Sequence, residues 1–159
     1  MKIYLLIVLF FSSCLYSCGA EKVTGLVVEK DGAYTYEKYM KNGVEDGVYK
    51  GYFNGKLSFF GEMSNGNYSG NWYWFNENGE IMIKFSNFSK NDDNLTLKEL
   101  NKTPEFKCFY EGYFSNGMIK EKGLVLFFKG DDPVSEGMEY GKYIYYDEKG
   151  NVIKTKIFE

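Results

Sequence analysis

The feature that most constrains the fold of this chain is an Asn-Gly dipeptide that recurs between short runs of aromatic and β-branched residues. The pair accommodates the positive φ angles of a type I′ turn, whose twist matches that of the two strands it joins. Such short runs are themselves typical of β-strands. The sequence therefore predicts consecutive antiparallel hairpins. The five dipeptides are Asn42-Gly43, Asn54-Gly55, Asn65-Gly66, Asn78-Gly79 and Asn116-Gly117, and the runs expected to form strands include residues 57–63, 72–75, 81–85, 124–128, 140–146 and 152–158.

A longer unit around these turns repeats along the chain. Residues 70–81 match residues 141–152 in character at every position: a glycine, aromatic residues, an acidic or amide turn, a second glycine and an aliphatic residue. Shorter copies occupy residues 47–57 and 110–119. Such self-similarity indicates stacked copies of one small structural unit. We expect structural turn glycines to close the four copies, at Gly55, Gly79, Gly117 and Gly150.

Two polar segments interrupt the repeats. An insert near residues 90–104 follows the second copy, and residues 130–137 precede the last one. Both segments are rich in Asp, Asn, Gly or Pro, so we expect loops. Residues 95–100 read Leu-Thr-Leu-Lys-Glu-Leu and fit either a short helix or an irregular strand.

The composition agrees with a single β-rich domain and excludes several chemistries. The 159 residues include 15 tyrosines, 14 phenylalanines and 2 tryptophans, a content that favours strands. The chain has no histidine and all its basic residues are lysines, which excludes a Ser-His-Asp triad, a His-ligated zinc and arginine clamps on phosphate. The net charge of −3 disfavours a nucleic-acid partner. We therefore expect a protein that is not an enzyme and that has no cofactor.

The N-terminus is typical of a secretory signal. Lys2 precedes an apolar run over residues 3–11, which is as long as a signal h-region and too short to span a bilayer. Residues 15–18, Leu-Tyr-Ser-Cys, resemble the lipobox of bacterial lipoproteins, in which the cysteine is acylated. The resemblance implies lipidation at Cys18, with Cys14 as a competing acceptor. An ordinary cleaved signal and a retained anchor are the alternatives.

This N-terminus divides the chain into three parts. We expect a lipoprotein signal peptide at 1–17 that forms a helix, an acylated tether at 18–24 and the repeat domain at 25–159. The lipid would attach the protein to a membrane of the bacterial cell envelope, at the outer membrane or the cell surface. Cys108 would then be left without an intrachain disulfide partner, and its aromatic surroundings favour a small buried side chain over a reactive thiol.

Two pairs of adjacent aspartates, Asp92-Asp93 and Asp131-Asp132, invite a search for a metal site. They fall in polar segments, where neighbouring carboxylates usually point apart, and no EF-hand spacing accompanies them. We expect solvated loops and no metal ion.

The aromatic residues give the sharper hypothesis of a ligand-binding row. Trp72 and Trp74 alternate along one predicted strand, so both indoles lie on one face. Tyr143 and Tyr145 hold the matching positions in the last repeat. An exposed row of rings stacks on sugars or serves as a protein hot spot, whereas a buried row fills the core, and we favour the core. The candidate ligand-binding aromatics are thus Trp72, Trp74, Tyr143 and Tyr145.

The glycine, aromatic and Asn-Gly pattern of residues 44–88 and 106–158 resembles the MORN repeat (membrane occupation and recognition nexus), particularly its bacterial variant. The resemblance implies an all-β fold in which antiparallel hairpins stack into an elongated meander. It also implies an interaction or scaffold module. With the expected lipid anchor, we expect its partner to be another envelope protein. Two alternatives remain open: a carbohydrate- or peptidoglycan-binding lipoprotein, and an antitoxin- or immunity-like partner.

Overall fold

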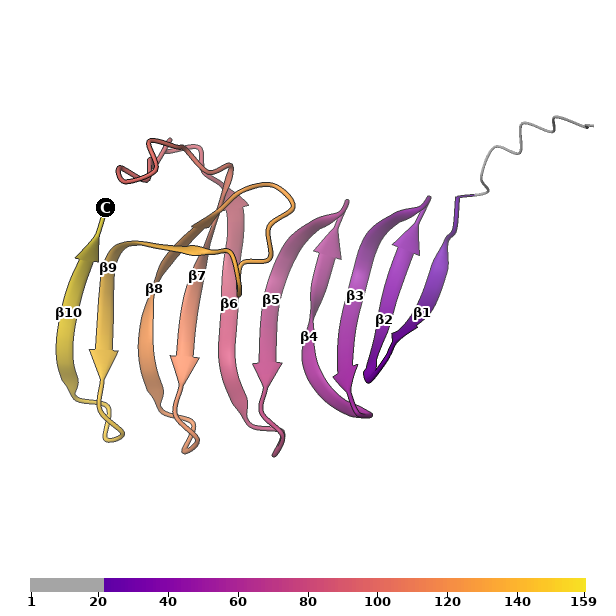
Figure 1. Cartoon of the computed structure of the whole chain (residues 1–159), viewed down its shortest axis with the longest axis horizontal. Helices are drawn as coiled ribbons and strands as arrows, with labels where there is room; N and C mark the ends of the chain where they lie inside the picture. Colours follow the sequence, from indigo (N-terminus) through magenta and orange to yellow (C-terminus); the bar gives the residue numbers. More distant parts are fainter. Residues whose placement is uncertain (1–21) are drawn as a thin grey trace, which may run out of the picture.

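The computed structural model describes residues 22–159, which form one antiparallel sheet of ten strands in chain order (Figure 1). Each strand pairs only with its neighbours in sequence, so the expected all-β hairpin meander is confirmed. No helix occurs in these residues, and the expected signal helix lies outside them. The strands are β1 (Gly25–Asp31), β2 (Tyr34–Lys41), β3 (Val44–Phe53), β4 (Lys56–Ser64), β5 (Asn67–Phe75), β6 (Ile81–Lys90), β7 (Phe106–Tyr113), β8 (Ile119–Phe127), β9 (Met138–Tyr146) and β10 (Val152–Phe158).

Three of the five Asn-Gly pairs form the predicted two-residue turns, between β2 and β3, β3 and β4, and β4 and β5. Asn42, Asn54 and Asn65 have φ angles of 53°, 49° and 49°, and the glycine that follows each of them also has a positive φ. Two successive positive φ angles are what a type I′ turn requires.

The type I′ prediction is wrong for Asn78-Gly79 and Asn116-Gly117. Each pair is the third and fourth residue of a five-residue loop, 76–80 or 114–118, in which only the glycine has a positive φ. In the first loop, Asn76 Oδ1 accepts hydrogen bonds from two backbone N–H groups of the loop, at 2.9 and 3.0 Å. A side chain that folds back on its own loop stabilises this wider turn, and the dipeptide alone carries no sign of it.

The four glycines that close the repeats all have a left-handed backbone, as expected. The φ angles are 77° at Gly55, 83° at Gly79, 80° at Gly117 and 83° at Gly150. An L side chain in this region costs about 1–2 kcal/mol. These glycines are therefore required by the turns themselves.

A second set of glycines lies within strands and makes room for aromatic rings. Gly61 on β4 and Gly123 on β8 are both buried. A Cβ at Gly61 would lie 2.5 Å from Cγ of Trp72 on β5, and one at Gly123 would lie 2.6 Å from Cγ of Tyr143 on β9. Each ring thus rests against the backbone of the preceding strand, which ties neighbouring hairpins together.

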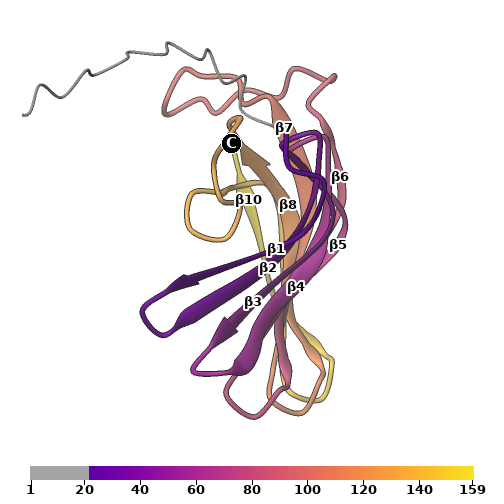
Figure 2. The same ribbon diagram turned by 90° about the vertical axis from the view of Figure 1, so that its right-hand side faces the viewer.

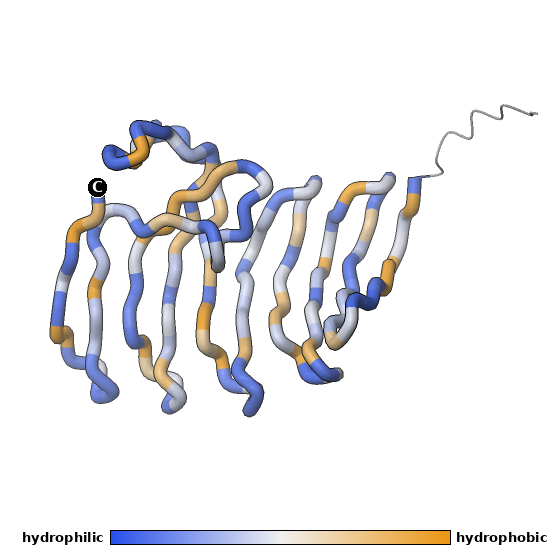
Figure 3. The backbone as a smooth tube through the Cα atoms, in the orientation of Figure 1, coloured by the Kyte–Doolittle hydropathy of each residue, from blue (hydrophilic) through white to orange (hydrophobic). Residues whose placement is uncertain are grey.

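The sheet is twisted, and the two inserts fold over the same face of its C-terminal half (Figure 2). The first insert, residues 91–105, and the second, residues 128–137, are loops as expected. Asn91 is buried and holds the first insert through side-chain hydrogen bonds to the backbone of Leu95 and Pro104. At the opposite end of the sheet, the hairpin turns are short and hydrophilic (Figure 3).

Residues 95–100 form neither a helix nor a regular strand. Leu97 makes a single antiparallel bridge with Lys102, and a turn joins the two. The side chain of Leu97 is buried, whereas that of Leu100 is 53% exposed.

Candidate binding surface

The two faces of the sheet carry different side chains. We call the face under the inserts the inner face; Trp72, Phe85 and Cys108 lie on it and belong to the hydrophobic core. The other face, here the outer face, carries Phe60 and Tyr73, which are opposite each other on β4 and β5 with ring centroids 6.4 Å apart. Because alternate residues of a strand point to opposite faces, every strand contributes to both.

A first row of inner-face side chains crosses the sheet and is largely buried. This buried row consists of Trp72, Phe85 and Tyr143, which are buried, with the partly buried Tyr49 and Tyr110. Phe85 is directly opposite Trp72 on one side and Tyr110 on the other. The rings of Tyr49 and Trp72 meet edge to face at 5.8 Å. The row forms the centre of the core.

Two of the four candidate ligand-binding aromatics therefore have a different role. Trp72 is 2% exposed and Tyr143 is 0% exposed, so neither ring reaches a ligand at the surface. Both are covered because a glycine of the preceding strand lets the ring sink into the sheet. The core interpretation holds for this pair of residues.

The two buried rings differ in how their polar atoms are satisfied. Trp72 Nε1 donates a hydrogen bond of 2.8 Å to the backbone oxygen of Glu62. The hydroxyl of Tyr143 is buried without a hydrogen-bond partner, and burial raises its pKa above the usual range. An unsatisfied buried hydroxyl carries a desolvation cost of about 1–3 kcal/mol.

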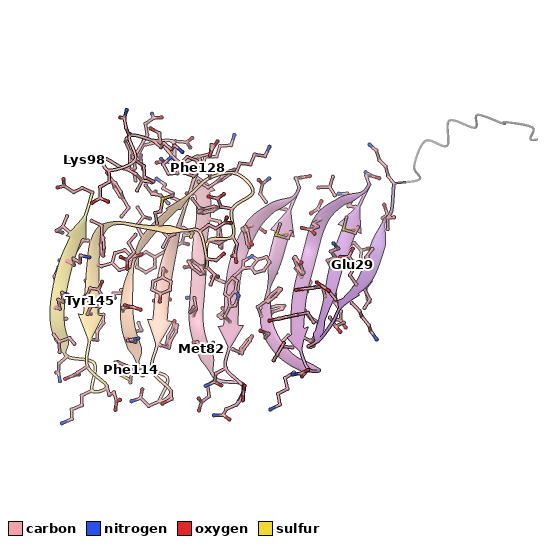
Figure 4. All side chains as sticks on the ribbon, in the orientation of Figure 1. Glu29, Met82, Lys98, Phe114, Phe128 and Tyr145 are labelled. Atoms are coloured by element: carbon pink, nitrogen blue, oxygen red, sulfur yellow. The ribbon has the colours of Figure 1, made fainter. Side chains whose placement is uncertain are left out.

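The other two candidates, Trp74 and Tyr145, lie in a second inner-face row that is partly exposed. This open row runs from Phe59 through Trp74, Ile83, Gly112 and Glu121 to Tyr145, each directly opposite the next across β4 to β9. Its side chains are half-buried, and Gly112, which has none, is buried. Figure 4 labels Tyr145 on β9, away from both inserts. The open row is thus one aromatic surface of the inner face that a partner can reach.

Polar groups are held at fixed points beside the open row. The hydroxyl of Tyr110 donates to Glu121 Oε1 at 3.0 Å, which orients this carboxylate between the aromatic residues. Burial and the charge of Glu121 raise the pKa of Tyr110, so the phenol stays protonated and remains a donor. Lys154 Nζ lies 5.4 Å from the ring centroid of Tyr145. The surface thus combines apolar rings with one anchored negative charge and one positive charge.

A groove of about 400 Å³ opens at the other end of the inner face, between β3–β6 and the second insert. Five aromatic side chains contribute to its walls. Burial raises the pKa of one of them, Tyr68, assisted by the nearby carboxylate of Asp132. Charged residues stand at the rim. The lining includes Tyr49, Met63, Tyr68, Phe88, Phe106 and Phe127 with Glu45, Lys90 and Asp131.

The remaining chemical candidates have structural roles. Cys108 is fully buried, as expected, and burial raises the pKa of its thiol, which disfavours the nucleophilic thiolate. Asp131 accepts a hydrogen bond from the backbone of Phe128, and Asp132 accepts one from that of Val134. Asp93 pairs with Lys107. Within residues 22–159, no three His, Cys, Asp or Glu side chains group to hold a metal ion.

Sequence reasoning missed the groove and the charged groups, Glu121 and Lys154, at the Tyr145 end of the open row. The groove depends on where the second insert folds, and its composition predicts a loop without a direction. No sequence pattern marks Glu121 as a member of the surface. Its position beside Tyr145 follows from the register of the strands, which bulges between β7 and β9 shift.

The lipidation candidates Cys18 and Cys14 lie outside the described residues. Among residues 22–159, the structure contains no helix long and apolar enough to cross a membrane. Comparison with known proteins adds no assignment: no family model matches the chain, and no curated protein matches its sequence.

Proposed function

We propose that this chain is an envelope lipoprotein, anchored through acylated Cys18, whose β-repeat sheet binds another envelope protein through the open row. The lipobox-like residues 15–18 and the preceding apolar run support the anchor. Two or three acyl chains hold a protein stably on a membrane, so no spanning segment is needed. Residues 18–24 add a tether of at most about 25 Å.

The open row is the observation that carries the binding proposal. Trp74 packs on Trp72 and Phe59 with ring centroids 5.7 and 6.0 Å away, so its position is fixed before a partner arrives. A rigid, half-buried ring loses little side-chain entropy on binding, and aromatic residues of this kind dominate protein interfaces. At the other end of the open row, the Glu121 carboxylate, directly opposite Tyr145, supplies a polar group that can orient a partner.

The same geometry favours a protein over a glycan. The burial of Trp72 and Tyr143 leaves only Trp74 and Tyr145 of the four candidate rings within reach of a sugar, and Phe59 is the one further ring beside Trp74 in the open row. Trp74 and Tyr145 belong to β5 and β9, four strand spacings or about 19 Å apart. The residues between them do not form a continuous aromatic platform. An antitoxin- or immunity-like role would use protein binding too, and the identity of the partner separates it from a scaffold.

The anchor is tested by fatty-acid labelling of the full chain in a bacterial host. We expect Cys18→Ser to abolish incorporation of labelled palmitate and to leave the product soluble or unprocessed. Cys14→Ser is the matched control and should label normally. Loss of label in the Cys14 variant alone would move the acceptor to Cys14, and normal labelling in both variants would refute the lipoprotein assignment.

The binding surface is tested by photo-crosslinking in intact cells. A photoreactive phenylalanine analogue is placed at Tyr145, on the inner face, or at its neighbour Tyr146, on the outer face. We expect a defined crosslinked protein from position 145 only. Trp74→Ser should remove this product, whereas Tyr73→Ser on the outer face should retain it. Equal products from both positions, or crosslinking that is unchanged by Trp74→Ser, would refute binding through the open row. Sedimentation with purified peptidoglycan that depends on Trp74 would favour the glycan alternative instead.

A further inference from the structure

The two edge strands of the sheet carry complementary side chains. β1 pairs only with β2, and β10 pairs only with β9, so within the described residues the outer backbone groups of each edge face no other strand. Exposed edges of this kind are templates for pairing with another chain. We propose that copies of this protein associate head to tail, with β10 of one copy pairing with β1 of the next. This self-association is independent of the partner proposed for the open row.

The topology allows this pairing without rearrangement. Each of the ten strands is antiparallel to the next, so β1 and β10 run in opposite directions. A second copy that is shifted along the sheet without being turned over therefore presents its β1 antiparallel to β10, with the inner faces on the same side. The result continues the meander with ordinary antiparallel hydrogen bonds.

On the inner face, the β10 edge is positively charged. Lys154 and Lys156 are opposite Tyr145 and Tyr143 of β9, which places both lysines on the inner face. Both side chains are exposed. A bulge near the start of β10 shifts the register at Ile153, so the regular part of the edge begins at Lys154.

On the same face, the β1 edge carries acidic residues. Glu29 and Asp31 are opposite Tyr36 and Tyr34 of β2. The ring centroids of Tyr36 and Phe59 are 6.2 Å apart, so Tyr36 lies on the inner face with Phe59. The two carboxylates, which are opposite Tyr36 and Tyr34, therefore also lie on the inner face. Both are exposed, and Figure 4 labels Glu29 at the β1 edge.

On the outer face, both edges expose apolar side chains, beside Lys30 on β1 and Thr155 on β10. Leu26 and Val28 of β1 are 63% and 53% exposed, and Ile157 of β10 is 60% exposed. Because side chains alternate between the two faces along a strand, Leu26 and Val28 lie on the outer face when Glu29 lies on the inner face. For the same reason Ile157 lies on the outer face when Lys156 lies on the inner face. Head-to-tail pairing would cover these side chains with one another.

The charges also select this arrangement over symmetric ones. In head-to-tail pairing Lys154 and Lys156 meet Glu29 and Asp31. Sliding one edge strand along the other by two residues would still leave the lysines and the carboxylates on the same face, because side chains repeat their direction every two residues. Pairing β10 with β10 would bring lysine against lysine, and pairing β1 with β1 would bring carboxylate against carboxylate. Like charges on directly opposite residues are destabilising. The contact is therefore heterologous, and an interface of this type extends into a row of copies unless it closes into a ring.

Charge reversal tests the proposal on the full chain, extracted from membranes in a non-ionic detergent and examined by sedimentation velocity. We expect wild type to form a concentration-dependent series of oligomers that weakens as salt is added. Reversing the β10 edge (Lys154→Glu with Lys156→Glu) should weaken association about tenfold or more. Reversing the β1 edge (Glu29→Lys with Asp31→Lys) should do the same. Combining both pairs of substitutions should restore association, because the charges are again complementary.

Controls separate edge pairing from unfolding and from net charge. Lys120→Glu with Lys149→Glu makes the same charge change at exposed positions off the edge and should associate like wild type. Thermal unfolding followed by circular dichroism checks that each variant is folded; Glu29 also pairs with Lys38 at 2.9 Å, so some loss of stability is expected there. A monomeric wild type at every concentration, or a combined variant as weak as the single-edge variants, would overturn the proposal. Dimers without larger species would indicate a symmetric contact and would overturn it as well.

Discussion

The packing of Tyr143 on Gly123 makes a quantitative prediction about how the hairpins are held together. In Gly123→Ala the new Cβ would lie 2.6 Å from Cγ of Tyr143 and closer still to Cδ2 and Cε2. Since ordinary carbon contacts are about 3.5–4.0 Å, the ring must move by about 1 Å, and it is 0% exposed. Overpacking of this kind costs about 1–3 kcal/mol, and full loss of a buried aromatic costs about 3–5 kcal/mol. We expect Gly123→Ala to cost about 3 kcal/mol in the free energy of unfolding.

A double-mutant cycle in urea shows whether the ring is the cause. In a Tyr143→Ala background the added methyl group meets no ring, so we expect Gly123→Ala to cost less than about 0.5 kcal/mol there, which gives a coupling energy of about 2–3 kcal/mol. Gly79→Ala is the matched control, because its φ is 83° with no atom within 4 Å of a new Cβ, and it should cost about 1–2 kcal/mol in either background. Equal costs of Gly123→Ala with and without the Tyr143 ring would refute the packing argument.

Three further predictions concern single groups. Tyr143→Phe removes a buried hydroxyl that has no partner, so we expect an unfolding free energy unchanged or higher by about 1 kcal/mol in urea titrations, and a clear loss would show that the hydroxyl is satisfied in solution. Asp147 has a lowered pKa because its carboxylate accepts hydrogen bonds from Asn151 and other groups of its loop; this contribution to stability is present above the unfolded pKa and is lost as pH falls through the folded pKa. NMR at low pH should therefore show the β9–β10 loop loosening before the β5–β6 loop, where Asn76 holds the matching position without titrating. Cys108 is buried with a raised thiol pKa, so we expect no alkylation by iodoacetamide at neutral pH until the protein is unfolded; rapid labelling of the native state would contradict its place in the core.

The sequence predicts the hairpin meander because its signals are local. An Asn-Gly pair needs only its own two φ angles to specify a turn, and this succeeded at Asn42, Asn54 and Asn65. At Asn78 the same dipeptide gives a wider loop, because Asn76, two residues earlier, supplies a competing side-chain acceptor. The turn glycines were predictable for the same reason, since a positive φ is a property of one residue.

The candidate surface was less predictable because it depends on pairs of strands. Trp72 and Trp74 share a face and an amino-acid type, and yet one is buried and the other half-buried. The difference lies in β4, where Gly61 lets the Trp72 ring sink and Phe59 lies opposite Trp74. Register and bulges decide which residue meets which, and neither is encoded in the spacing of a single strand.

Burial is uneven along the meander, and the edge strands are the least buried part of it. A sheet in which each strand touches only its neighbours is stabilised interface by interface, much as in a solenoid. The fully buried side chains lie between β4 and β9, whereas β1, β2 and β10 contain none. The end strands therefore gain least from the core and would gain most from another strand. Because Val23 is hydrogen-bonded to the β2–β3 turn, the chain enters β1 from the end of the sheet rather than from its edge. In adjacent paired copies the proposed tethers would leave from the same end of the strands, turned relative to each other by the twist of the sheet, so edge pairing would not cover them.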